Sequence, residues 1–139
     1  MITPEMAELV YDLSNGHTYY VQMLCRELWS TYTKEINTSA QVLSTLTGIV
    51  ERNSTEYFSL RNLLTAVQWS VLTAVAADGV VAHPTSHDFL TRYGLGTSAT
   101  VLRSLEALVD RELIYRNEQG HYAIYNPFFG WWVANILRR

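Results

Sequence analysis

The fold is decided by residues 84–125, PTSHDFLTRYGLGTSATVLRSLEALVDRELIYRNEQGHYAIY. Apolar side chains recur at helical spacing on both sides of a Gly-Leu-Gly turn at 94–96. From Leu113 onward the pattern changes to two short strands, 113–117 and 121–125, with a tight turn between them. The stretch therefore predicts a helix, a turn, a second helix and a β-hairpin.

The segments on either side complete this pattern. Before it, Thr65-Ala66-Val67-Gln68 has the spacing of a capping box that starts a helix, and Val80-Val81-Ala82 reads as a short extended piece. After it, Pro127 begins a final helix rich in aromatic residues. Three short helices followed by a two-stranded ribbon are the element order of a winged helix, a helix-turn-helix variant that serves both DNA readers and protein-docking modules.

Caps and apolar stripes give more detailed expectations for this region. Thr85 with Asp88 is expected to cap the second helix, and Thr97 or Ser98 the third. The helices are expected to bury one common set of side chains, which are Val71, Leu72, Leu102, Leu105 and Leu108.

The first part of the chain predicts three more helices. Thr3 and Pro4 start the first, a second covers about 17–32, and a third starts near Thr38 and runs on towards Leu60. We place a boundary at the end of this third helix. The expected fold is mainly α, with a helical segment over 1–58 and a winged helix-turn-helix with a two-stranded β wing over 59–139.

Composition excludes several classes of protein. Hydrophobic residues make up 48% of the 139 residues, which is enough to build a core. Cys25 is the one cysteine, so an internal disulfide and a multi-cysteine zinc site are excluded. No apolar run approaches the roughly 18 residues of a membrane span, and residues 1–13 lack a signal-peptide pattern, so a cytoplasmic location is expected.

Charge is distributed unevenly along the chain. The net charge is −3. Residues 1–59 carry three basic and seven acidic side chains, a net charge of −4, and residues 60–139 carry seven arginines and six acids, a net charge of +1. A nucleic-acid surface would therefore have to lie in the second half, where no basic stripe is visible.

No catalytic, metal or cofactor site is expected in this chain by itself. It lacks the Gly-x-x-x-x-Gly-Lys-Ser/Thr loop that cradles a triphosphate and has no serine in a nucleophile elbow. His83 and His87 are four residues apart, but Pro84 separates them and His83 precedes the helix.

Two groups of side chains are candidates for binding a partner. Candidates for DNA contact are Arg92, Thr97, Thr100, Arg103 and Arg116. Glu106 and Asp110 on the same helix as Arg103 would repel phosphate, so the favoured interpretation is a helix that packs on the core and faces solvent or protein. The second group is an aromatic interaction patch of Phe128, Phe129, Trp131 and Trp132. Two adjacent tryptophans cannot face one side of a helix, which predicts a bare indole and a weak homodimer or another covering surface.

Two segments resemble the C-terminal part of archaeal-type P-loop ATPases of the AAA+/STAND group, which are distantly related to origin-recognition ATPases. Residues 13–25, LSNGHTYYVQMLC, look like the lid-helix motif of that family, and residues 84–132 are similar to its winged helix and closing motif, here YNPFFGWW. The resemblance implies a lid-like segment over 1–58, a parent ATPase that uses ATP and Mg²⁺, and a nucleotide-proximal role for Gly16 and His17. Thr18 stands where the family has proline, and Asn126 where it has aspartate.

Together these patterns favour a non-catalytic regulatory and interaction module that couples the nucleotide state of an ATPase core to a partner. The alternative is a sequence-specific DNA-binding winged helix related to transcription or replication. Salt distinguishes the two, because DNA binding weakens steeply with ionic strength and aromatic docking hardly responds.

Overall fold

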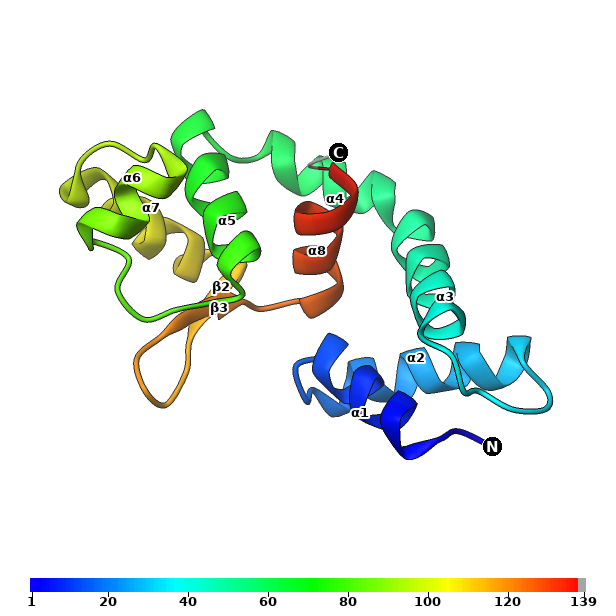
Figure 1. The fold of residues 1–139 in the computed structure, drawn as a ribbon. Helices are drawn as coiled ribbons and strands as arrows, with labels where there is room; N and C mark the ends of the chain where they lie inside the picture. The colour runs from blue at the N-terminus through cyan, green and yellow to red at the C-terminus, as the bar shows by residue number, and fades with distance from the viewer. Residues whose placement is uncertain (138–139) are drawn as a thin grey trace. The chain divides into compact units, whose positions relative to one another are not determined.

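The computed structural model describes residues 1–137 and divides into two compact units, Met1–Thr55 and a second unit that begins at Glu56 (Figure 1). The division falls at the start of α4 (Ser54–Asn62), and the boundary expected at 58/59 lies in the same helix. Each unit is described by itself below. No helix within residues 1–137 is both long and apolar enough to cross a bilayer.

The first unit contains three helices: α1 (Pro4–Leu13), α2 (Thr18–Thr31) and α3 (Ser39–Arg52). Thr3 caps α1 as predicted, by accepting a hydrogen bond from the Met6 amide at 3.4 Å. A capping box between Thr38 and Gln41 starts α3. The core side chains of this unit include Val10, Leu24, Leu28, Ile36, Val42 and Leu46.

The third helix is shorter than the sequence predicts. The continuous helix expected to run towards Leu60 ends at Asn53, and α4 begins at the next residue. The Asn53 side-chain amide donates to the Ile49 carbonyl at 2.9 Å, and its backbone N–H turns back to the Val50 carbonyl at 3.1 Å. These bonds satisfy the last carbonyls of α3, so the helix stops where apolar periodicity alone would continue it.

The second unit has the element order of a winged helix. After α4 come α5 (Ala66–Asp78), β1 (Val80–Val81), α6 (His87–Tyr93), α7 (Ser98–Asp110), β2 (Ile114–Arg116), β3 (Tyr122–Ile124), α8 (Pro127–Trp131) and a π-helical turn, η1 (Trp132–Leu137). The capping box from Thr65 to Gln68 forms as predicted and starts α5, and Thr97 caps α7. The mainly helical fold with a β wing is confirmed.

The sheet has one more strand than predicted. Its order is β1-β3-β2, with both pairs antiparallel. The extended piece at 80–82 becomes an edge strand, because Val80 pairs with Ala123 and Val81 with Tyr122, and the Val81 side chain is buried. The wing hairpin β2–β3 is thereby tied to the end of α5.

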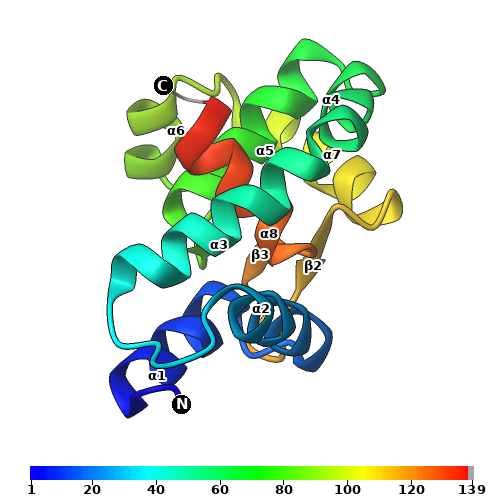
Figure 2. The ribbon, with the colours of Figure 1, turned by 90° about the vertical axis from the view of Figure 1, so that its right-hand side faces the viewer.

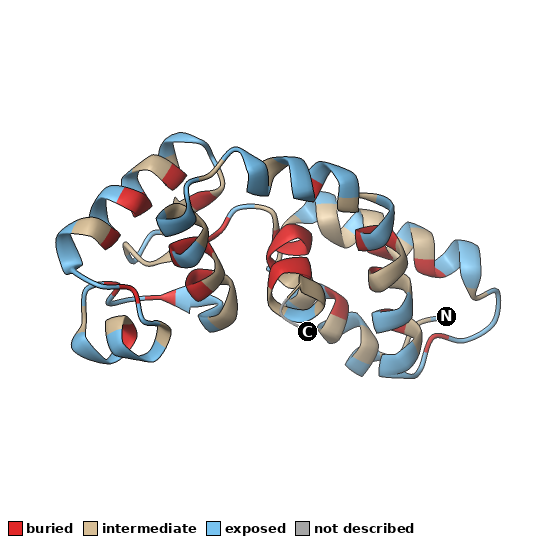
Figure 3. Ribbon diagram, turned by 90° about the horizontal axis from the view of Figure 1, so that it is seen from above, coloured by how far each residue is buried: buried red, intermediate tan, exposed pale blue. Residues whose placement is uncertain are grey.

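The core of the second unit forms where α5 and α7 pack side by side (Figures 1 and 2). Its buried residues, red in Figure 3, include Val71, Leu72, Val75, Val101, Leu105, Leu108 and Ile114. The prediction for Leu102 is wrong, since this side chain is 42% exposed. The buried face of α7 runs through Val101, Ser104 and Leu105, and Leu102 lies one residue, or about 100°, beyond Val101.

The cap of α6 also differs from the prediction. Ser86, and not Thr85, is the N-cap, and its hydroxyl accepts from the Phe89 amide at 3.2 Å. The preceding Pro84 is buried, which fixes how the chain enters the helix. Asp88 takes no part in the cap and pairs with Arg92 instead.

Candidate nucleic-acid interface

The candidate recognition helix α7 turns a mixed face to solvent. Ala99, Arg103, Glu106 and Asp110 are exposed and lie opposite the buried face. The Thr97 and Thr100 hydroxyls, predicted to contact DNA, lie 2.8 Å from each other, and Thr97 also accepts from the Thr100 amide at 3.2 Å. These two side chains are therefore engaged in starting the helix.

Arg103 is the guanidinium on this face that stays available. It is exposed and forms no ion pair with any residue in the described part of the chain. Glu106 and Asp110 follow it on the same face, so the exposed charge of α7 is one cation against two anions. Such a face attracts phosphate weakly at best.

Arg92 is held by the protein's own carboxylates. Its guanidinium bonds Asp78 Oδ1 at 2.9 Å and also pairs with Asp88, and it lies over the Tyr93 ring at 5.4 Å. The hydrogen bond to Asp88 raises the Arg92 pKa, and the hydrogen bond that the Tyr93 hydroxyl donates to Asp78 raises the Tyr93 pKa. Two carboxylates neutralise this arginine, so it offers little charge to DNA.

Arg116 lies on the wing, across β2 and β3. Its guanidinium stands over the Tyr122 ring at 5.1 Å, and two of its nitrogens donate to the Gly120 carbonyl at 3.4 Å each. A hollow of about 180 Å³ between the wing and α7 is lined by Glu106, Val109, Asp110, Arg116 and Tyr122. The two carboxylates of α7 thus share a hollow with the wing arginine.

The three arginines therefore do not combine into one basic surface. Arg92 belongs to a cluster with Asp78 and Asp88, Arg116 faces a hollow with acidic walls, and Arg103 alone is free. Sequence reasoning did not identify Asp78 or Tyr122 as partners. The hairpin register could have revealed the second, because Arg116 and Tyr122 are direct cross-strand neighbours.

The two residues predicted to be close to a nucleotide have structural roles in the first unit. Gly16 has φ +70°, and a Cβ there would lie 2.8 Å from the Tyr11 hydroxyl oxygen. The positive φ would strain a residue with a side chain at this turn, which favours glycine. His17 is the N-cap of α2, makes no side-chain capping bond, and has its ring 6.1 Å from the Tyr20 ring. A nucleotide-proximal role for either residue stays a prediction.

The aromatic patch predicted at the C-terminal end is mostly core. Phe128, Phe129 and Trp132 are each at most 2% exposed, and Trp131 is partly buried. The prediction that these three side chains belong to an interaction patch is wrong, since all three are buried, and α4 supplies aromatic rings that pack against Phe129 and Trp132. Tyr57 lies 5.2 Å from Phe129 and 5.4 Å from Trp132, measured between ring centroids. Trp131 is the partly exposed member of the tryptophan pair, as expected for one of the two indoles, and the weak homodimer stays a prediction.

Metal-binding side chains do not gather in the described part of the chain. Residues 1–137 contain no group of three or more His, Cys, Asp or Glu side chains placed to hold a metal ion. His83 lines a second hollow of about 180 Å³ beside Asp78, Asp88 and Arg92, where both carboxylates are already paired with the arginine.

Comparison with known proteins agrees with this architecture. Residues 55–135 match a family model described as a probable winged helix domain. The match covers more than half of the chain and includes α4 from its second residue, with the aromatic rings that complete the core. No curated protein and no solved structure matches the chain.

Proposed function

The chain belongs to the family described as probable winged helix domain, and from this premise we propose that it is a non-catalytic interaction module whose α7 and wing dock on another protein. Winged helices bind DNA or proteins, so the choice between the two depends on the surface that this one presents.

One observation carries the proposal, and it is the charge of that surface. The exposed face of α7 sets Arg103 against Glu106 and Asp110, and the same two carboxylates line the hollow beneath Arg116. Duplex DNA presents a dense row of phosphates to a recognition helix, and two acids on its exposed face would have to be desolvated beside them. A protein surface carries no such row of negative charges and can place a cation opposite each carboxylate.

An apolar side chain on the same helix supports docking on protein. Leu102 is 42% exposed and lies on the side of α7 where Val109 lines the hollow by the wing. Exposed leucine on the same side of the helix as partly buried Val109 adds apolar surface to a charged face, and protein interfaces combine surface of both kinds.

The finer part of the proposal links the module to an ATPase. We infer from the resemblance of residues 13–25 and 84–132 that the partner is a P-loop ATPase core, which would hold ATP and Mg²⁺ and be regulated through this chain. Gly16 and His17 would then be the residues nearest to the nucleotide. A cytoplasmic location goes with this proposal.

DNA binding is the second candidate, and the free Arg103 favours it. A titration of a labelled duplex by fluorescence anisotropy at low and at physiological salt separates the candidates. We expect no saturable binding at either salt. Salt-sensitive binding that Arg103→Ala abolishes would overturn the proposal in favour of DNA.

The protein partner can be found by site-specific crosslinking. A benzoylphenylalanine in place of Leu102 should crosslink to one protein in cells of the source organism, and the same photoprobe in place of exposed His87 on α6 serves as the control. A protein captured from position 102 and not from 87 supports docking through α7, and a P-loop sequence in it supports the ATPase link. Equal capture from both positions contradicts the assigned surface.

A further inference from the structure

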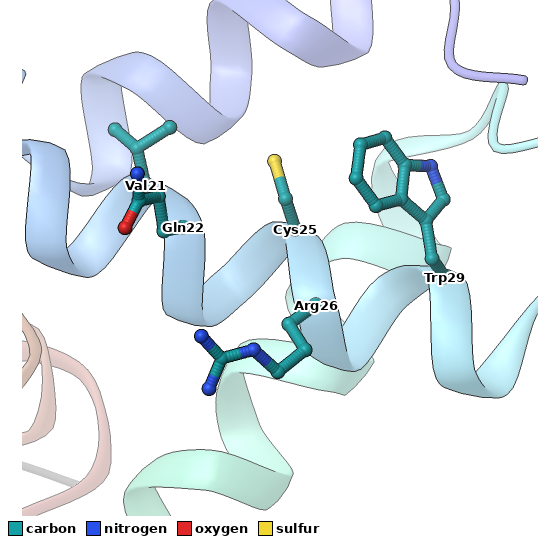
Figure 4. A pocket seen from close by; sticks show the side chains of 5 residues that line it. All are labelled: Val21, Gln22, Cys25, Arg26 and Trp29. Atoms are coloured by element: carbon teal, nitrogen blue, oxygen red, sulfur yellow. The ribbon is translucent and has the colours of Figure 1, made fainter.

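One face of α2 in the first unit carries an open groove that the winged helix does not explain. It has a volume of about 400 Å³, and its walls are Val21, Gln22, Cys25, Arg26 and Trp29 (Figure 4). Figure 4 shows Cys25 and Trp29 rising from one side of α2 and Arg26 extending from the other. The groove runs between these two sides.

The walls follow the spacing of helix ridges. Val21, Cys25 and Trp29 are four residues apart and form one row, and Gln22 and Arg26 form a second row with the same spacing. Rows of residues at i±4 are the ridges of a helix surface, and the groove between two rows is the shape that receives a ridge of another helix. We propose that this groove of α2 docks an amphipathic helix of a partner protein, with an apolar ridge in the groove and an acidic side chain opposite Arg26.

The apolar wall has the character of an interface core. Trp29 is 58% exposed, and exposed tryptophan at a hollow is typical of residues that dominate binding energy. Burial raises the pKa of the Cys25 thiol, so this side chain stays neutral and adds to the apolar wall. On the opposite side of α2, Leu24 and Leu28 are fully buried and anchor the helix in the core of the first unit.

Charge specifies the partner. Arg26 is the one charged residue that lines the groove, and it forms no ion pair with any residue in the part of the chain that the structure describes. Its neighbour Glu27 pairs with Arg52 at 3.0 Å, on a different side of the helix. An unpaired guanidinium beside an apolar groove is complementary to a helix that carries a carboxylate at that height.

The same charge argues against other occupants. A second copy that paired through the same groove would bring another Arg26 and no acidic side chain, so like charges would meet. A small molecule would touch walls from one helix only and leave most of its surface in water, unlike the enclosed sites that small ligands use. A partner helix can pack into an open groove on one helix, so it fits this geometry.

Binding of designed helical peptides to the full chain tests this inference. The probes are fluorescently labelled peptides of about 20 residues, with leucine at i, i+4 and i+8 and one glutamate at different heights on the adjacent row. Twins carry lysine in place of glutamate, or a central proline that prevents the helix. We expect saturable binding of at least one glutamate peptide, and a loss of about tenfold or more for its lysine and proline twins and for Trp29→Ala.

A charge swap makes the test specific for Arg26. The variant Arg26→Glu should reverse the preference, so that the lysine peptide binds better than the glutamate peptide. The matched control is the other exposed arginine beside a tryptophan, Arg61, which lies 5.2 Å over Trp69 in the second unit; Arg61→Glu and Trp69→Ala should leave binding unchanged.

Three results would overturn the inference: no saturable binding of any glutamate peptide, equal loss in the control variants, or no reversal by Arg26→Glu. Concentration-dependent dimerisation of the free chain that Trp29→Ala abolishes would also overturn it, by showing that a second copy fills the groove. The outcome is independent of the proposed docking through α7, because that docking involves the second unit alone.

Discussion

Two leucines on α7 offer a direct test of how the winged helix is packed. Leu105 is 1% exposed and Leu102 is 42% exposed, although both lie on the same helix and differ by less than one turn. Replacing each by alanine removes the same three carbon atoms, Cγ and both Cδ. The two variants therefore differ only in what surrounds the atoms that are lost.

The expected costs differ by a clear margin. At Leu105 the lost transfer free energy is accompanied by a cavity that packed neighbours cannot fill, and such substitutions cost about 2–5 kcal/mol. At Leu102 close to half of the side chain is already in water and no enclosed cavity forms, so the cost is about 1 kcal/mol or less.

Urea unfolding followed by tryptophan fluorescence measures this difference. In a Trp29→Phe background the remaining tryptophans, Trp69, Trp131 and Trp132, all lie in the second unit, so the signal reports that unit. With a slope of roughly 1–2 kcal/mol per molar urea, the Leu105→Ala midpoint should fall about 0.5 M or more below that of Leu102→Ala. Equal midpoints for the two variants would refute the assignment of the buried face.

Three further predictions follow from single contacts in the second unit. Asn126 accepts hydrogen bonds from the first amides of α8, so Asn126→Ala should lower the free energy of unfolding by about 1 kcal/mol in urea titrations and Asn126→Asp should not; equal losses would contradict the cap. Gly130→Ala should cost about 1–3 kcal/mol in thermal melts, because its Cβ would lie 3.2 Å from Cβ of buried Ile124, and an unchanged melting temperature would show that the strand yields. The hydrogen bond that Tyr93 donates to Asp78 raises the Tyr93 pKa, so the folded state holds the hydroxyl proton more tightly than the unfolded state does. The stability that this bond contributes is complete below about pH 10 and is lost as pH rises through the folded pKa. Tyr93→Phe should lack this alkaline loss in denaturation curves recorded above about pH 9, and a wild type with the same pH dependence as the variant would rule the linkage out.

Helix starts were predictable where the signal lies within four residues. Thr65 with Gln68 forms the expected capping box, and Thr97 caps α7, because both halves of each bond are close in sequence. The cap of α6 was assigned to Thr85 although Ser86 forms it. Thr85 and Ser86 are adjacent and either could cap the helix. The choice depends on how the chain enters the helix after buried Pro84, and the burial of Pro84 is a tertiary feature that local sequence does not reveal.

Much of the candidate interface depends on tertiary contacts. Arg92 looked available for DNA because Asp78, which neutralises it together with Asp88, is fourteen residues earlier in the chain. The acids on α7 were visible in the sequence, and the structure places both of them on the exposed face of the helix. What periodicity could not give was the hollow that brings them to the wing arginine.

The aromatic end was misjudged for a related reason. Adjacent Trp131 and Trp132 cannot both face inward on a regular α-helix, so a bare patch was expected. The helix changes to a π turn at Trp132, and rings from α4, more distant in sequence than any local pattern reaches, close over it. The sequence showed that the C-terminal helix is rich in aromatic residues, but it did not show that α4 covers Trp132.

The contacts of the α4 rings with Trp132 also determine where a fragment that contains the winged helix must begin. Phe58 meets the Trp132 indole edge-on at 4.9 Å, and Tyr57 is buried against the same ring. A fragment cut at α5, where the winged-helix pattern begins, would expose this indole and the Phe129 ring to water and favour aggregation. An expression fragment, or a recombination event that moves this domain to another protein, therefore keeps the piece intact only if it also carries α4.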